Sequence, residues 1–314
     1  MTAAAAYELS DLFGADGRQA LEHLRVRARR LVTGMLHGGH RSRRKGVSTE
    51  FDHHALYQPG DPLKLIDWKA SARHDRVYVK RQLEDTALQV RLVVDRSGSM
   101  RRATGTGPTK YLQAARLATA LAFVILEERD RFGLTIAGGD AGHRSADGKT
   151  DAWLPAGSGE TQLVRFVKAL CTAEGSGRDG LAEPLRVQVE RSERRGLTVL
   201  ISDLMFDPGP VQSQLARLAA QGHDLLVFQV CDPVEQDFPF SRWIRFQSLE
   251  AGGRGRRVDT VPLKRLYREE FAAVQEEWRA WCRRSDSHFC IARSDAAMET
   301  ALAEYLSFRE RIGR

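Results

Sequence analysis

Short apolar segments alternate with longer amphipathic segments through most of the chain, and this alternation limits the folds open to it. The apolar runs predict strands at residues 87–94, 132–137, 196–202, 224–230 and 288–292. Apolar residues at helical spacing predict helices at residues 110–128, 161–171, 181–194, 210–221, 262–284 and 296–309. Apolar strands separated by helices are typical of parallel sheets that are covered on both faces. We therefore expect an α/β fold with a doubly wound, mostly parallel sheet.

Two segments depart from this alternation. Residues 138–154 begin with polar, glycine-rich turns and end in a short strand, which predicts a hairpin. Residues 232–258 are rich in Pro, Gly and Arg and contain short β-type pieces, and a helix follows them. We therefore expect residues 232–285 to be a small, β-rich insertion before the last strand. Residues 76–83, RVYVKRQL, alternate like a strand and are expected to pair with pieces of this insertion.

The positive charge of the chain is concentrated near its N-terminus. The 314 residues carry a formal net charge of +7. Between Arg18 and Lys45 there are nine Lys or Arg residues and one acid, so this segment carries 9 − 1 = +8 and the rest of the chain 7 − 8 = −1. Apolar residues recur at helical spacing between Leu21 and Met35, which predicts a basic amphipathic helix.

The basic helix has two interpretations. The one we favour is that it packs on the body of the protein with its basic face in solvent. The other is contact with nucleic acid, an anionic membrane surface or an acidic partner. The segment between Arg18 and Lys45 contains no aromatic residue on which bases could stack, so nucleic acid is the less favoured of these partners.

Several classes of protein are disfavoured by the sequence. The longest apolar run, residues 117–126, is much shorter than the roughly 20 residues that cross a bilayer, and the N-terminus does not resemble a signal peptide. We therefore expect a cytoplasmic protein without a membrane span. The four cysteines form no C-x-x-C pair, which favours reduced thiols. The sequence lacks a phosphate-binding loop, an H-E-x-x-H motif and a G-x-S-x-G motif, so no catalytic residue is predicted and we do not expect an enzyme.

Oxygen-bearing side chains gather near the ends of predicted strands. Asp95, Ser97 and Ser99 follow the first apolar strand, Asp203 follows another, and Thr161 begins a helix. Ligands of open α/β sheets bind at the carboxyl edge, where we expect these side chains to meet. Carboxylate and hydroxyl oxygens suit Mg²⁺ or Mn²⁺ rather than Zn²⁺. The alternative is structural, because Ser and Asp after a strand are common helix caps and need no ion.

Several motifs together resemble a known family. The sequence DRSGSM after an apolar strand, with a later Thr and a strand-end Asp, resembles the metal-ion-dependent adhesion site of von Willebrand factor A domains. Residues 60–73, GDPLKLIDWKASAR, and the later sequences VYVKRQLED, LISDL and GHDLLVFQVCDPVEQDFP resemble the bacterial family called domain of unknown function 58. Members of that family carry such an A-type domain, and the resemblance extends from about Ser48 to the C-terminus.

The resemblance implies a von Willebrand factor A-like fold with a divalent-cation site. Its ligands are implied to be Asp95, Ser97, Ser99, Thr161 and Asp203. Thr161 matches only by its order and its place at a helix start, and many such domains have Gly after the strand-end acid where this chain has Leu. Family members often lack enzymatic activity and are thought to act as adaptors or co-chaperones of MoxR-type AAA+ ATPases. Many carry N-terminal membrane helices, and this chain resembles those without them.

The signature block at residues 60–73 also has two interpretations. Gly60 and Asp61 precede a proline and predict a turn. In one interpretation the block binds a partner with Trp68 as an anchor, because Trp is frequent in interface hot spots. In the structural interpretation, which we favour, Asp61 or Asp67 pairs with Arg73 while Trp68 fills a gap against the A-type domain.

These observations divide the chain into a basic helical arm at residues 1–46, the signature segment at 47–86 and the A-type domain at 87–314. The function we favour is a non-enzymatic binding module. Its cation would coordinate a carboxylate of a MoxR-type ATPase or of that ATPase's client protein. The alternatives are a metal-dependent phosphoesterase that uses the same acids, and a binder of nucleic acid or an anionic surface through the arm.

Overall fold

The protein was analysed as a computed structural model. The structure describes residues 26, 47–57, 66–74, 76–84, 87–101, 108–137, 153–172, 180–192, 195–240, 242–246 and 255–312. The predicted basic arm lies outside these residues except for Val26, which is helical.

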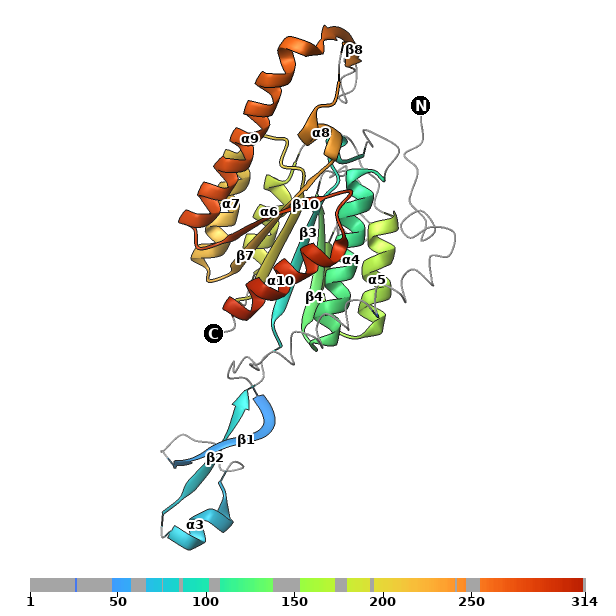
Figure 1. Cartoon of the computed structure of the whole chain (residues 1–314). Coiled ribbons are helices and arrows are strands. Elements are labelled where there is room, and N and C mark those ends of the chain that lie inside the picture. Colours follow the sequence, from blue (N-terminus) through green and yellow to red (C-terminus); the bar gives the residue numbers. More distant parts are fainter. Residues whose placement is uncertain are drawn as a thin grey trace.

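Six strands form one central sheet, in the order β10-β7-β6-β3-β4-β5 (Figure 1). The strands are β3 (Gln89–Asp95), β4 (Arg131–Ala137), β5 (Trp153–Gly157), β6 (Leu197–Ser202), β7 (Asp224–Cys231) and β10 (His288–Arg293). Neighbouring strands pair in parallel, except that β5 is antiparallel to β4. The prediction of an α/β fold with a mostly parallel sheet is therefore confirmed. The antiparallel pairing of β4 with β5 agrees with the predicted hairpin.

Helices pack against both faces of this sheet. One face packs against α4 (Lys110–Glu127), α5 (Glu160–Thr172) and α10 (Met298–Ile312). The other packs against α6 (Ala182–Arg191), α7 (Pro208–Ala220) and α9 (Thr260–Arg284). Along β3, Leu92 and Val94 belong to the first core and Val93 to the second. Because both faces are buried, the central strands are apolar throughout, which is the pattern that predicted them.

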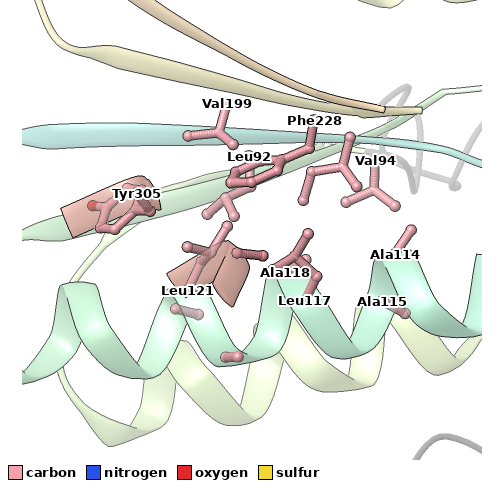
Figure 2. Packing of buried hydrophobic residues seen from close by; sticks show 14 of the residues in the cluster. Leu92, Val94, Ala114, Ala115, Leu117, Ala118, Leu121, Val199, Phe228 and Tyr305 are labelled. Carbon is pink, nitrogen blue, oxygen red and sulfur yellow. The ribbon is translucent and has the colours of Figure 1, made fainter. Parts of the chain in front are cut away.

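Helix α4 is the main helix of the first core. Its first turn is capped by Thr109, whose hydroxyl accepts a hydrogen bond from the backbone N–H of Leu112 at 3.1 Å. Figure 2 shows small and branched side chains of α4 facing those of the strands, with Tyr305 of α10 entering the same layer. The labelled side chains are Ala114, Ala115, Leu117, Ala118 and Leu121 from α4 and Leu92, Val94, Val199 and Phe228 from the strands. Burial of this apolar surface is the main term that holds α4 to the sheet.

The insertion before β10 differs in detail from the prediction. It contains α8 (Pro233–Asp237), the antiparallel pair β8 (Trp243–Phe246) and β9 (Arg256–Asp259), and the long helix α9. Its two strands pair with each other, so the expected pairing with residues 76–83 is wrong.

Strand β2 (Tyr78–Glu84) pairs instead with β1 (Val47–Leu56), a strand that the sequence did not reveal. The sequence of β1, VSTEFDHHAL, does not alternate regularly between apolar and polar residues, and its pairing with β2 carries register shifts. It therefore lacks the clean alternation from which strands are predicted.

The core is expected to be intolerant of cavities. We predict that Leu92→Ala, at a fully buried position of β3, lowers the free energy of unfolding by about 2–5 kcal/mol through lost burial and an unfilled cavity. Leu266→Ala in α9 is the matched control, because that side chain is 54% exposed. Urea unfolding followed by circular dichroism measures both. Equal losses in the two variants would contradict the assigned core.

Candidate functional site

The candidate site lies where the direction of the chain through the sheet reverses. Strand β3 lies between β4, the next strand in sequence, and β6, which the chain reaches later. In open α/β sheets, the carboxyl ends of the two strands at such a point border the ligand-binding crevice. Asp95 is the last residue of β3 and Asp203 directly follows β6, so both predicted acids belong to this point.

Asp95 is the centre of a buried group of oxygens. The residue is 1% exposed, and its two carboxylate oxygens accept different hydrogen bonds. Oδ1 accepts from the backbone N–H of Ser97 at 2.8 Å, and Oδ2 accepts from the hydroxyl of Ser202 at 2.5 Å. The hydroxyls of Ser97 and Ser99 lie 3.1 Å apart at the start of a short 3-10 helix, η2 (Gly98–Arg101). The structure therefore brings the predicted triplet Asp95, Ser97 and Ser99 together.

Asp203 is held by a buried ammonium group that the sequence analysis did not single out. Lys110, the first residue of α4, donates from Nζ to Oδ2 of Asp203 at 2.8 Å and to Oε1 of Glu235 at 2.5 Å. Lys110 and Asp203 are both almost fully buried, and Glu235 is partly buried. The other oxygen of Asp203 accepts from the backbone N–H of Met205 at 3.2 Å. One cation thus ties α4 to the end of β6 and to α8.

Glu235 reaches the site because α8 is capped in a specific way. Asp232 caps α8 by accepting from the N–H of Val234, and Glu235 accepts from the N–H of Asp232 through Oε2. Its other oxygen is then free to accept from Lys110. An Asp followed three residues later by Glu is a capping-box pattern, so the sequence DPVE carried a signal for this helix start.

The electrostatics of the site are dominated by buried carboxylates. Three carboxylates, Asp95, Asp203 and Glu235, lie at this edge, and Lys110 contacts the last two of them. Burial and the charge of Asp203 raise the pKa of Asp95 to about 6, although hydrogen bonds from Ser202 and Ser97 act in the opposite direction. Burial alone would lower the pKa of Lys110, but the charges of Asp203 and Glu235 raise it. Negative charge is therefore in excess.

The backbone is strained directly after Asp203. Leu204 has a φ of 59°, in the left-handed region that favours glycine. Its side chain is fully buried in the second core, and its N–H donates to the hydroxyl of Ser202 at 3.0 Å. Packing and this hydrogen bond hold a conformation that is costly for leucine. Glycine would adopt this conformation without that cost.

Thr161 is not brought to the same edge as Asp95. The strand before it, β5, runs antiparallel and ends at Gly157 opposite Phe132, near the start of β4. The neighbouring Gln162 donates to the carbonyl of Phe132 at 2.9 Å, which fixes the start of α5 there. In register, Asp95 lies beside the last residue of β4, five residues beyond Phe132 or about 17 Å along the strand. The sequence analysis assumed that α5 starts at the carboxyl edge, which holds only after a parallel strand.

The other end of α5 does lie at the edge that carries Asp95. The hydroxyl of Tyr111, next to Lys110 at the start of α4, donates to the carbonyl of Leu170 near the end of α5 at 2.6 Å. The chain then continues through residues 173–179, which lie outside the described part of the structure, to α6.

The signature residues are only partly described. Gly60, Asp61 and the side chain of Arg73 lie outside the described residues. Asp67 caps the short helix α3 (Trp68–His74) by accepting from the N–H of Ala70 at 3.0 Å, and its own N–H donates to the carbonyl of Tyr78 in β2. Asp67 thus has a structural role.

The expectation that Trp68 fills a gap is wrong. Its side chain is 69% exposed on α3. A tryptophan in a sequence gives no sign of which side of a short helix will face solvent, because seven residues provide too few positions to define a periodic apolar face.

The donor set at the carboxyl edge is suitable for a hard divalent cation. Asp95, Ser97 and Ser99 offer carboxylate and hydroxyl oxygens, which Mg²⁺ and Mn²⁺ prefer. The buried carboxylates of Asp95 and Asp203 favour a cation at this point, and burial together with the charge of Asp203 raises the pKa of Asp95. Asp203 is the less available ligand because Lys110 already holds one of its oxygens. The residues therefore fit such an ion around the triplet.

Comparison with known proteins places the chain in a family. The model of the family described as "Protein of unknown function DUF58" matches residues 54–281. This chain belongs to that family. Uncharacterized proteins of Mycobacterium bovis and Mycobacterium tuberculosis are 30% identical to it over 265 residues, which cover 83% of this chain and 78% of theirs. The resemblance noted from the sequence is thereby confirmed at the level of the DUF58 family.

Solved structures with some similarity come from distant proteins. BatB from Bacteroides thetaiotaomicron is 16% identical, with a TM-score of 0.42, over 72% of this chain and 100% of that one. An aerotolerance-related membrane protein from Bacteroides fragilis is 16% identical, with a TM-score of 0.43, over 69% of this chain and 95% of that one. An uncharacterized membrane-spanning protein from Vibrio fischeri is 15% identical, with a TM-score of 0.20, over 70% of this chain and 97% of that one.

The names of these solved structures bear on the predicted location of the protein. The cytoplasmic location predicted from the sequence is contradicted, since two of the three structures belong to membrane proteins, and it is not retained. In the part of the chain that the structure describes, no helix has both the length and the apolar character that crossing a membrane requires.

The buried carboxylate predicts a pH-dependent stability. An acid whose pKa is higher in the folded chain than in the unfolded chain destabilises the fold when it ionises. The destabilisation by the Asp95 carboxylate therefore grows as the pH rises from about 4 and is complete above about 6. We predict that Asp95→Asn, measured in EDTA, raises the free energy of unfolding by about 2 kcal/mol at pH 8 and by much less at pH 4.5. Urea unfolding at both pH values measures this, with Asp207→Asn at the exposed cap of α7 as the control for lost charge. A variant that is less stable than wild type by the same amount at both pH values contradicts the assignment.

The buried ion pair makes a second prediction. Lys110→Met leaves Asp203 and Glu235 without their shared ammonium, so the free energy of unfolding at pH 7 is expected to fall by about 3–5 kcal/mol. Arg186→Met is the control, because the contacts of Arg186 with Glu183 and Glu190 are at the surface. Thermal unfolding compares the two. An equally small effect of both substitutions contradicts a buried pair at Lys110.

Proposed function

We propose that residues 87–314 form a von Willebrand factor A-like binding domain that holds a divalent cation at its carboxyl edge. The observation that carries the proposal is the triplet at the reversal point of the sheet, in which Asp95 and Ser97 are buried and Ser99 is partly buried, in a site with excess negative charge. In this proposal the triplet supplies hard oxygen ligands, and Mg²⁺ or Mn²⁺ supplies the affinity for an acidic side chain of a partner protein.

The described residues have distinct tasks in this proposal. Asp95 provides a carboxylate whose position is fixed by Ser202 and by the N–H of Ser97. Ser97 and Ser99 provide hydroxyls on the same side of a tight turn. Lys110 keeps Asp203 and Glu235 oriented and prevents their charge from repelling an incoming carboxylate. These side chains bind and orient, which supports a binding module over the phosphoesterase alternative.

The proposed partner follows from family membership and from the chemistry of the site. A cation with open coordination positions recognises carboxylates, so the partner must present an exposed Asp or Glu. For a DUF58 protein we propose a MoxR-type AAA+ ATPase or its client as that partner, with this chain acting as an adaptor or co-chaperone. The exposed loops around the edge would add contact area, and the cation would add specificity.

Cation binding is the first test. Isothermal titration of the full chain with Mg²⁺ and with Mn²⁺ at pH 8 is expected to show one site, which Asp95→Asn abolishes and Ser99→Ala weakens. Asp207→Asn, which removes an exposed carboxylate elsewhere, is expected to bind as wild type does. Identical titrations of wild type and Asp95→Asn would remove the basis of the proposal.

Partner binding is the second test. Immobilised full chain is expected to retain a MoxR-type ATPase from the same organism in Mg²⁺ buffer, to release it in EDTA, and to retain it again when Mg²⁺ is restored. Asp95→Asn is expected to behave in Mg²⁺ as wild type does in EDTA. Retention that is indifferent to both EDTA and the substitution would leave the cation without a role in partner binding.

A further inference from the structure

A second group of metal-ligating side chains lies between the last strand and the last helix. His288 and Cys290 belong to β10, an edge strand of the sheet, and Glu304 belongs to α10, which packs against it (Figure 1). His288 and Cys290 are two residues apart in a strand, so their side chains project from the same face. That face is the one that α10 covers. Strand alternation and helix packing thus place the three side chains together.

The three groups have the spacing of ligands around one ion. One nitrogen of His288, the sulfur of Cys290 and a carboxylate oxygen of Glu304 all lie within 4.8 Å of one another. Nε2 of His288 is 3.2 Å from Oε2 of Glu304, and Sγ of Cys290 is 3.8 Å from the same oxygen. In a tetrahedral zinc site the usual bond lengths put N and O about 3.4 Å apart and S and O about 3.6 Å apart. The observed distances therefore approach two edges of such a tetrahedron.

His288 is held with the required nitrogen facing the group. Nη2 of Arg311 lies 3.0 Å from Nδ1 of His288. A guanidinium can only donate, so Nδ1 is the acceptor and the proton of the neutral ring is on Nε2. The ring also stacks on Phe308, with a centroid distance of 5.5 Å and an interplanar angle of 9°. Ligand histidines are commonly positioned by donating from their other nitrogen, so Nδ1 must take up the ring proton and release Arg311 before Nε2 can bind a metal.

We propose that His288, Cys290 and Glu304 form a Zn²⁺ site, separate from the site at Asp95. Thiolate, imidazole and carboxylate are the three ligand types that zinc takes in proteins, and three protein ligands leave a fourth position for water. The thiol disfavours Mg²⁺, which selects oxygen ligands. Glu304 is about half exposed, so the site is reached from solvent without opening the core.

Binding at this site releases one proton. The thiol proton of Cys290 leaves to solvent, and the ring proton of His288 moves from Nε2 to Nδ1 with loss of the Arg311 contact, so a thiolate and a neutral imidazole bind the metal. The cation, the thiolate and the carboxylate of Glu304 then sum to zero charge. Burial and the charge of Glu304 raise the pKa of Cys290, so the metal must displace a firmly held proton. Affinity is therefore expected to rise with pH.

The new site and the site at Asp95 can be tested independently. Cys290 of β10 pairs in register with Phe228 of β7. Phe228 pairs with Ile201 of β6, and Ile201 pairs with Val94 of β3. Three strand spacings separate Cys290 from Val94, or about 14 Å. No ligand is shared between the two sites.

Cobalt absorption of the full chain tests the proposal. Co²⁺ added at pH 8 to reduced protein is expected to give a near-ultraviolet thiolate-to-cobalt charge-transfer band that saturates at one equivalent and disappears when Zn²⁺ is added. Glu304→Gln, which alters an exposed side chain, is expected to weaken Co²⁺ binding at least about tenfold. Cys290→Ser is expected to remove the band.

Two further variants identify the source of the signal. Cys282→Ser removes a buried thiol from the other core and is expected to keep the band, and Asp95→Asn is expected to keep it as well. Absence of the band in folded wild type, or its full retention in either Cys290→Ser or Glu304→Gln, would overturn the proposal. If Cys290→Ser does not fold, as judged by circular dichroism, Glu304→Gln alone decides.

Discussion

The parallel pairing of β3 with β6 brings two carboxylates close together at the carboxyl edge, and the neighbouring groups of the site compensate their charge. Its register places the end of β3 beside Ser202, so the carboxylates of Asp95 and Asp203 are buried close to each other. Two like charges in a low-dielectric setting are costly unless cations and hydrogen bonds compensate. Ser202, Lys110 and the N–H of Ser97 provide part of that compensation, while burial and the charge of Asp203 raise the pKa of Asp95. We propose that a bound divalent cation completes it.

The same compensation connects the site to distant parts of the chain. Lys110 links the start of α4 to the end of β6 and to Glu235 at the beginning of the insertion. Gln229 of β7 donates to the carbonyl of Asp203, and Gln275 of α9 donates in turn to Gln229. The insertion is thus fixed to the carboxyl edge through polar contacts at both of its helices. A partner that contacts the insertion and a ligand at Asp95 would act on one connected structure.

The sequence predicted the sheet well because both of its faces are buried. Apolar runs such as residues 196–202 are unambiguous when a strand has no solvent side, and Asp95 and Asp203 could be placed from the ends of those runs. Thr161 was misplaced, although the predicted hairpin already implied an antiparallel β5, after which the chain enters α5 at the opposite edge. Lys110 was missed because a lysine at a helix start is ordinarily solvated. Its burial depends on Asp203 and Glu235, which are 93 and 125 residues away in sequence.

The central claim is that a cation belongs among Asp95, Ser97 and Ser99. The most direct measurement is a crystal structure of the full chain grown with Mn²⁺, with anomalous diffraction recorded at the manganese absorption edge. The account predicts an anomalous peak within bonding distance of an oxygen of Asp95 and of the hydroxyls of Ser97 and Ser99, at about 2.0–2.3 Å. Ordered side chains at these three positions without a peak between them would contradict it.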